Sequence, residues 1–276
     1  MVASAGIIYA LTIVLYSLSV LGYFIDFLQN NRKVNRTAFW LLSIVWVLQT
    51  LFFVIRALQY DRLPIITPFE GLFFYAWLLV SLSLIINWFF RVDFLVFFTN
   101  VVGFVMMAFS LFTPGGDVPS DLNELLISEL LIVHVTLIMI GYAAFTIAFV
   151  FAALYVFQHH LLKQKRWGKR LLRLENLPKM ERFIFWMTTF GVPFMLLGFI
   201  LGFVWASIQL SQLPWLDAKV IGSAVVLAVY SAYLYLWAVR HRRGYNMALF
   251  NIAGFMFVLI NYFLSSELTD FHFWYF

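Results

Sequence analysis

The stretch from residue 129 to 145, ELLIVHVTLIMIGYAAF, decides the fold class of this chain. It opens an apolar run that extends to residue 160, which is longer than the about 20 residues that cross a bilayer as a helix. One ionisable side chain, His134, lies about one and a half turns inside the outer end of this run. The run therefore predicts a transmembrane helix, and an ionisable residue within such a helix indicates a function.

The composition of the whole chain agrees with this prediction. Of its 276 residues, 64% are hydrophobic and only 11% are charged, whereas about a quarter of the residues in a soluble domain are charged. The chain has no cysteine, which excludes disulfides, thiolate chemistry and covalent attachment of a c-type haem. We therefore predict a polytopic membrane protein.

Eight apolar runs are long enough to span a bilayer, and the links between most of them are short. We predict an all-α fold, a bundle of eight transmembrane helices forming a single domain over residues 1–276. The predicted spans are 5–28, 37–57, 69–90, 94–113, 128–160, 183–208, 219–239 and 247–266, with a basic cytoplasmic segment at 161–182.

The distribution of basic residues predicts the orientation. Fifteen of the 18 Lys and Arg fall on one side of the predicted bundle, and only Arg56, Arg62 and Lys219 fall on the other. Because basic residues accumulate on the cytoplasmic side, both termini are predicted to lie outside. The same distribution explains the net charge of +5, so it does not indicate binding to nucleic acid.

The basic segment 161–182 is predicted to continue the fifth span into the cytoplasm as an amphipathic helix. It has two interpretations, an anchor on the anionic lipid leaflet or a docking site for a cytosolic partner. His159, His160 and His241 lie beside basic clusters on this side and are most simply interfacial residues.

Two histidines, His134 and His272, are predicted to lie on the outer side, the second just beyond the last span. For His134 the simple alternative is a hydrogen bond between helices. A zinc ion would need three or four ligands, usually with cysteine or carboxylate among them. A haem iron needs two axial ligands, an apolar aromatic cleft and cations near its propionates. Haem b with His134 and His272 as iron ligands is therefore one prediction.

Several other residues at the predicted outer ends would suit a haem. Arg56 and Arg62 are candidates for the propionates, because arginine pairs with carboxylates bidentately; ordinary interfacial cations, which Asp61 could neutralise, are the alternative. Trp205, Trp215 and Lys219 are the aromatic and cationic candidates around the link between the sixth and seventh spans.

Glu70, at the start of the third span, has two interpretations: a cap of the helix N-terminus or a hydrogen-bond partner for a ligand imidazole. Trp77 lies seven residues further on the same helix face. It either lines the cleft or faces lipid.

Four stretches resemble the haem-handling family of cytochrome c assembly proteins, the CcsA, ResC and CcmC group. They are PIITPFEGLFFYAW (64–77), HVTLIMIGYAA (134–144), GFILGFVWA (198–206) and the tail from GFMFVLINYF (254–263) to FHFW (271–274). The resemblance implies that His134 and His272 are haem ligands on the outer side.

The chain also departs from the pattern of this family. LDAKV (216–220) keeps Asp217 and Lys219 but lacks the Trp, Pro and Glu of the family's tryptophan-rich loop, and Tyr235 stands where the family has an inner histidine. These departures favour resemblance to the HemX branch, found in Gram-positive bacteria. That branch is associated with lowering the level of glutamyl-tRNA reductase.

From the resemblance we expect a non-enzymatic haem-binding protein of the plasma membrane that regulates haem biosynthesis. The implied partners are haem, lipid and a cytosolic protein, either glutamyl-tRNA reductase or a protease that acts on it. A haem carrier or accessory subunit of cytochrome c assembly is one alternative. A transporter for haem or a small anion is another, although few charges are predicted at the bilayer midplane.

Overall fold

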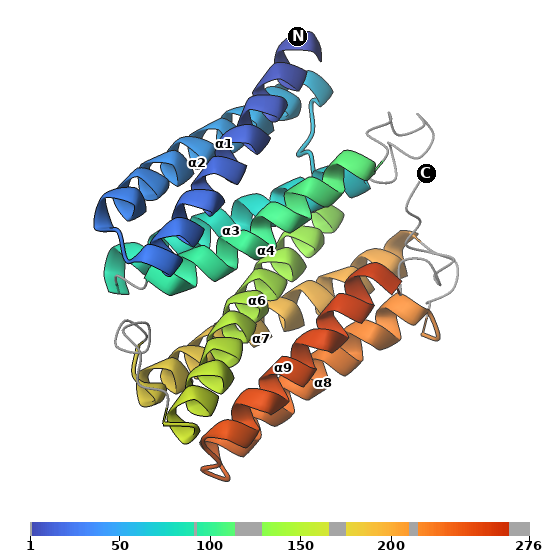
Figure 1. The fold of residues 1–276 in the computed structure, drawn as a ribbon. Coiled ribbons are helices and arrows are strands. Elements are labelled where there is room, and N and C mark those ends of the chain that lie inside the picture. Colours follow the sequence, from blue (N-terminus) through green and yellow to red (C-terminus); the bar gives the residue numbers. More distant parts are fainter. Residues whose placement is uncertain (1, 91–92, 114–128, 166–174, 210–214, 265–276) are drawn as a thin grey trace. The chain divides into compact units, whose positions relative to one another are not determined.

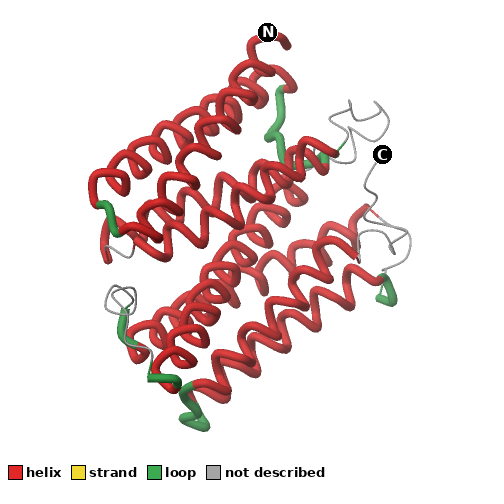
Figure 2. Tube along the Cα trace, viewed as in Figure 1, coloured by secondary structure: helices red, strands yellow, loops and turns green. Residues whose placement is uncertain are grey.

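The structure, a computed structural model, describes residues 2–90, 93–113, 129–165, 175–209 and 215–264. These residues form helices joined by short loops, and no strand occurs among them (Figure 2). Eight helices within these described ranges are long and apolar enough to cross a membrane, which confirms the predicted all-α fold with eight spans. The outside location of both termini stays a prediction.

The helices group into two compact units, residues 1–120 with 275–276 and residues 121–274. The first unit contains α1 (Val2–Gln29), α2 (Arg32–Tyr60), α3 (Pro68–Phe90), α4 (Asp93–Phe109) and the 3-10 turn η1 (Ser110–Phe112) (Figure 1). The second contains α6 (Glu129–Lys163), α7 (Leu177–Gln209), α8 (Ala218–Ala238), α9 (Tyr245–Leu259) and the π-helical segment η3 (Ile260–Leu264). The single domain predicted for the whole chain stays a prediction.

Buried polar contacts tie the helices of the first unit together. The hydroxyl of Tyr16 on α1 donates to Oδ1 of Asn100 on α4 at 2.9 Å, and Nδ2 of Asn100 donates to the hydroxyl of Ser83 on α3 at 2.8 Å. All three side chains are fully buried. Such bonds matter in a membrane because lipid tails are as apolar as the side chains, so the hydrophobic effect does not drive helices together.

In the second unit, α6 and α7 pack antiparallel along a seam of small residues. A Cβ atom on Gly141 of α6 would lie 3.2 Å from the carbonyl oxygen of Gly191 on α7, and a Cβ atom on Gly198 would lie 3.1 Å from the backbone nitrogen of Ile138. Further along, the rings of Phe151 and Phe183 stack with centroids 4.7 Å apart. The glycines let the two backbones approach closely, as small residues do in membrane helix pairs.

The pair α8 and α9 completes the second unit. Asp217 caps the N-terminus of α8, its carboxylate accepting from the backbone nitrogen of Lys219 at 2.8 Å. Helix α9 continues without a break into η3. A π-helical turn of this kind is rare and frequently occurs at functional sites.

Candidate functional site

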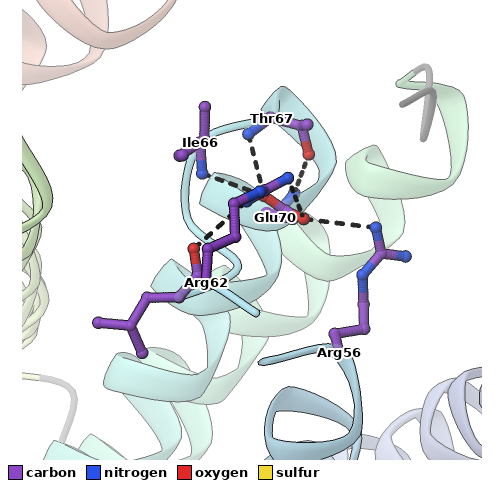
Figure 3. A network of polar contacts seen from close by, with 6 residues as sticks. Arg56, Arg62, Ile66, Thr67 and Glu70 are labelled. Atoms are coloured by element: carbon purple, nitrogen blue, oxygen red, sulfur yellow. Dashed lines mark hydrogen bonds and ion pairs between the residues drawn. The ribbon is translucent and has the colours of Figure 1, made fainter. Parts of the chain in front are cut away.

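Glu70 contacts Arg56 and Arg62, the two arginines of the first unit that are predicted to lie on the outer side. Its Oε2 lies 2.9 Å from Nη1 of Arg62, and its Oε1 lies 3.3 Å from Nη2 of Arg62 and 3.4 Å from Nη2 of Arg56 (Figure 3). The Arg62 contact is therefore bidentate, the stronger form of the arginine–carboxylate pair. The sequence suggested Asp61 as a partner of these arginines. Asp61 is instead exposed and ends α2 in a left-handed conformation with φ 50°. The carboxylate that pairs with both arginines is that of Glu70.

The same carboxylate caps helix α3. Oε2 of Glu70 accepts from the backbone nitrogens of Ile66 and Thr67, each at 3.1 Å, and the backbone nitrogen of Glu70 donates to Oγ1 of Thr67 at 3.2 Å (Figure 3). This reciprocal arrangement is a capping box, and Pro68 occupies the first helical position, where its missing N–H is harmless. The motif T67-P-F-E70 carries the signal for this capping box in the sequence.

Aromatic rings surround the guanidinium of Arg56. Its Cζ lies 4.9 Å from the ring centroid of Tyr60 and 5.2 Å from that of Phe69. Within the described part of the chain, the buried Nε of Arg56 has no hydrogen-bond partner. Two guanidinium groups share one carboxylate here, so the cluster of Arg56, Arg62 and Glu70 keeps a net charge of +1.

Trp77 does not join this arginine cluster. Its Nε1 donates to the hydroxyl of Thr50 on α2 at 2.9 Å, and its ring stacks on Phe53 and Phe74 with centroids 6.1 Å and 5.8 Å away. These contacts place Trp77 in the packing between α2 and α3.

His134 lies on α6 and faces α7. Its Nδ1 is 2.6 Å from the carbonyl oxygen of Gly198. A carbonyl oxygen can only accept, so Nδ1 carries the proton in this contact, and in the neutral ring the lone pair then lies on Nε2. The imidazole therefore makes a hydrogen bond between helices, and this bond also fixes its tautomer.

The other predicted aromatic residues of the second unit lie near α7. Trp205 is buried and shares a helix face with Gly198 and Gly202, since the three residues follow a spacing of four and then three. Trp215 is 64% exposed, and its ring lies 5.0 Å from that of Phe203.

Lys219 belongs to a polar cluster that the sequence did not suggest. Its Nζ donates to the carbonyl oxygens of Asn261 at 2.7 Å and Tyr262 at 3.3 Å, both in the π-helical segment. Nδ2 of Asn261 donates in turn to the hydroxyls of Tyr142 at 2.6 Å and Ser223 at 3.0 Å. No sequence motif predicts a lysine whose hydrogen-bond partners are backbone carbonyls. Only the folded structure therefore reveals this cluster.

The second predicted haem ligand, His272, lies outside the described residues. Among the residues that the structure describes, no three His, Cys, Asp or Glu side chains gather as ligands for a metal ion. His134 is thus the one predicted iron ligand whose surroundings can be described.

The sequence matches a known protein family. The model of the family described as cytochrome C assembly protein matches residues 65–272. The chain belongs to the cytochrome c assembly protein family. The match includes Glu70, His134, Lys219 and His272.

Within the cytochrome c assembly family, the chain is HemX-like. It is 50% identical over 261 residues to protein HemX of Bacillus subtilis, covering 95% of each chain. It is 47% identical over 267 residues to protein HemX of Brevibacillus brevis, covering 97% of each. It is also 22% identical over 230 residues to the cytochrome c biogenesis protein CcsA of Mesostigma viride, covering 75% of each. The eight apolar helices and the Bacillus and Brevibacillus relatives identify a multi-pass bacterial membrane protein.

Proposed function

We propose that this protein binds haem b on the outer side of a Gram-positive plasma membrane, with His134 and His272 as the iron ligands. Membership of the cytochrome c assembly family supports a role in haem handling. The observation that carries the proposal is the hydrogen bond from Nδ1 of His134 to the Gly198 carbonyl. Metal-ligating histidines almost always donate their second ring N–H in this way.

The hydrogen bonding of His134 fits a residue that would hold haem iron. The donor bond leaves the lone pair of the neutral ring on Nε2, the atom that would hold iron. Haem, when bound, would supply a redox-active iron within an apolar macrocycle. The residues of the chain bind and orient it, and we propose no bond-making reaction.

Arg56 and Arg62 remain our proposed partners for the haem propionates. Their cluster has a net positive charge, and the Nε of Arg56 has no partner within the described residues. A carboxylate is the natural acceptor for such a donor. Glu70 would then act by holding the two guanidiniums in place, while Trp77, Trp205, Trp215 and Lys219 are proposed to support the site.

If His134 and His272 both held the iron, they would leave it no open position, which favours carriage, sensing or electron transfer over oxygen chemistry. The similarity to HemX supports sensing, and we propose that the protein lowers the level of glutamyl-tRNA reductase. Helix α6 runs without interruption from Glu129 to Lys163, so it joins His134 directly to the basic segment 161–182. That segment is the proposed contact for the reductase or for a protease acting on it.

The visible spectrum of the detergent-purified protein tests haem binding. We expect a low-spin spectrum typical of two imidazole ligands, either as isolated or after addition of hemin. His134→Ala and His272→Ala should each lose this spectrum or become high-spin. An unchanged low-spin spectrum in both variants would refute the assignment of the ligands.

The regulatory role has a separate test. Replacing the Lys and Arg residues of 163–173 with Gln should abolish the lowering of glutamyl-tRNA reductase while hemin still binds. Unchanged reductase levels with the neutralised segment would exclude it as the signalling element.

A second candidate function is that of a haem carrier or accessory subunit in cytochrome c assembly. The family match over residues 65–272 and the similarity to CcsA support it. Deleting the gene distinguishes the two functions. Loss of holocytochrome c would favour the carrier or accessory role, whereas raised glutamyl-tRNA reductase with normal holocytochrome c would favour the regulator.

A further inference from the structure

The imidazole of His134 lies directly against the backbone of α7 at Gly202. A Cβ atom built on Gly202 would be 2.6 Å from Cε1 and 2.7 Å from Nδ1 of His134. Real Cβ atoms essentially never make contacts that short. The position of the ring therefore requires that residue 202 has no side chain.

Two features of His134 make the contact difficult to relieve. The imidazole is a rigid ring, so it cannot fold away as the end of a long flexible side chain would. Its Nδ1 is also held at 2.6 Å from the carbonyl oxygen of Gly198, one helical turn before Gly202. Any movement that relieves a clash at residue 202 would displace the ring from that hydrogen bond.

We propose that Gly202 is a positioning residue for the haem ligand His134. It leaves the space that the imidazole occupies against α7, with its Nδ1–H on the Gly198 carbonyl. This inference rests on the proposed function, because it assigns Gly202 a part in haem ligation through His134.

The hydrogen bond to Gly198 has a chemical consequence for iron. A ring that donates its Nδ1–H to an acceptor is a more basic ligand at Nε2. A more basic ligand stabilises ferric iron, and hydrogen bonding to axial ligands is one of the means by which proteins adjust haem potentials. Losing the bond should therefore weaken hemin binding and raise the midpoint potential.

The test compares Gly202→Ala with a matched substitution on the same helix, Gly191→Ala. A Cβ atom on Gly191 would lie 2.6 Å from Cε1 of Phe145 on α6, so both variants crowd an aromatic ring of α6 with one methyl group. Only the first touches the predicted ligand. We expect hemin to bind roughly tenfold more weakly to Gly202→Ala. Affinity losses of this size are usual when a metal-ligating histidine loses the hydrogen bond of its other ring nitrogen. We also expect the midpoint potential of Gly202→Ala to be higher than that of the wild type. Gly191→Ala should keep both the hemin affinity and the midpoint potential of the wild type.

Equal hemin affinity and equal potential in the two variants would overturn the role of Gly202. The proposed function fails differently, because His134→Ala would then leave the haem spectrum of the wild type unchanged. If Gly202→Ala does not fold well enough for hemin titration, the contact is tested by the free energy of unfolding. This is measured for Gly202→Ala in the wild-type background and in the His134→Ala background. Alanine at 202 should destabilise the protein when His134 is present and be nearly neutral in His134→Ala; the same loss in both backgrounds would refute the contact.

Discussion

Replacing Glu70 with glutamine tests the arginine cluster most directly. Glutamine has nearly the same shape but removes the negative charge that Arg56 and Arg62 share. Only 1% of the Glu70 side chain and 5% of the Arg62 side chain are exposed, whereas 15% of Arg56 is exposed. Glu70→Gln therefore leaves Arg62 buried without a counter-ion among the residues that the structure describes.

The expected loss of stability follows from these exposures. Removing one partner of a buried ion pair costs about 3–5 kcal/mol. Arg56 can turn toward water more readily than Arg62, and the amide oxygen of Gln can still accept from the backbone nitrogens that Glu70 caps. Retaining the cap saves most of the ~1 kcal/mol that an N-terminal cap contributes. We therefore expect Glu70→Gln to lower the free energy of unfolding by about 3 kcal/mol, the low end of the range.

The assay is equilibrium unfolding in mixed detergent micelles, with SDS as the denaturant. Glu181→Gln is a suitable control, because Glu181 accepts a backbone hydrogen bond from Gly244 at 2.9 Å and is joined to no arginine or lysine in the described structure. It should lose less than about 1 kcal/mol. A loss for Glu70→Gln no larger than for the control would refute the buried ion pair. Adding Arg62→Met to Glu70→Gln should recover part of the loss, since it removes the unpaired cation.

Two further predictions concern buried contacts elsewhere. Gly103→Ala should cost about 1–3 kcal/mol by overpacking, because its Cβ would lie 2.5 Å from the Tyr16 hydroxyl. Gly6→Ala, which has nothing within 4 Å, should change stability by less than about 0.5 kcal/mol in the same titration. Lys219→Met should cost about 1–3 kcal/mol, because it removes the donor from two buried carbonyls in the π-helical segment. An unchanged unfolding midpoint for Lys219→Met would show that water replaces the amine without loss.

The spans were predictable from the sequence because a bilayer demands long apolar helices and the chain supplies them with few polar interruptions. The sequence did not predict which acidic side chain pairs with which arginine. Asp61 precedes Arg62 in the chain, but the left-handed end of α2 turns it to solvent. Glu70, in the first turn of α3, contacts Arg62 in the loop before it and Arg56 on α2. Proximity along the chain was therefore a poor guide to the ion pair.

Two sequence motifs nevertheless indicated the local structure around Glu70 and opposite His134. T67-P-F-E70 is a capping box, and G198-x-x-x-G202 is the small-residue spacing of close membrane helices. Neither motif reveals what lies opposite it: two arginines in one case, an imidazole in the other. A motif fixes the local backbone, but the partner depends on the packing of distant segments, which only the folded structure supplies.

The charge balance of the arginine cluster bears on how the proposed haem site would work. A propionate that reaches Arg56 and Arg62 meets a net charge of +1, because Glu70 already neutralises one guanidinium. Its electrostatic attraction is therefore weaker than two uncompensated arginines would provide. A haem sensor needs such a moderate attraction, because it must release haem when the haem concentration falls. Haem shifts the equilibrium of a sensor only by its differential affinity for the two states. In the proposed haem sensor, Glu70 would thus stabilise the haem-free protein at the expense of haem affinity, and the proposed regulation would depend on that reversibility.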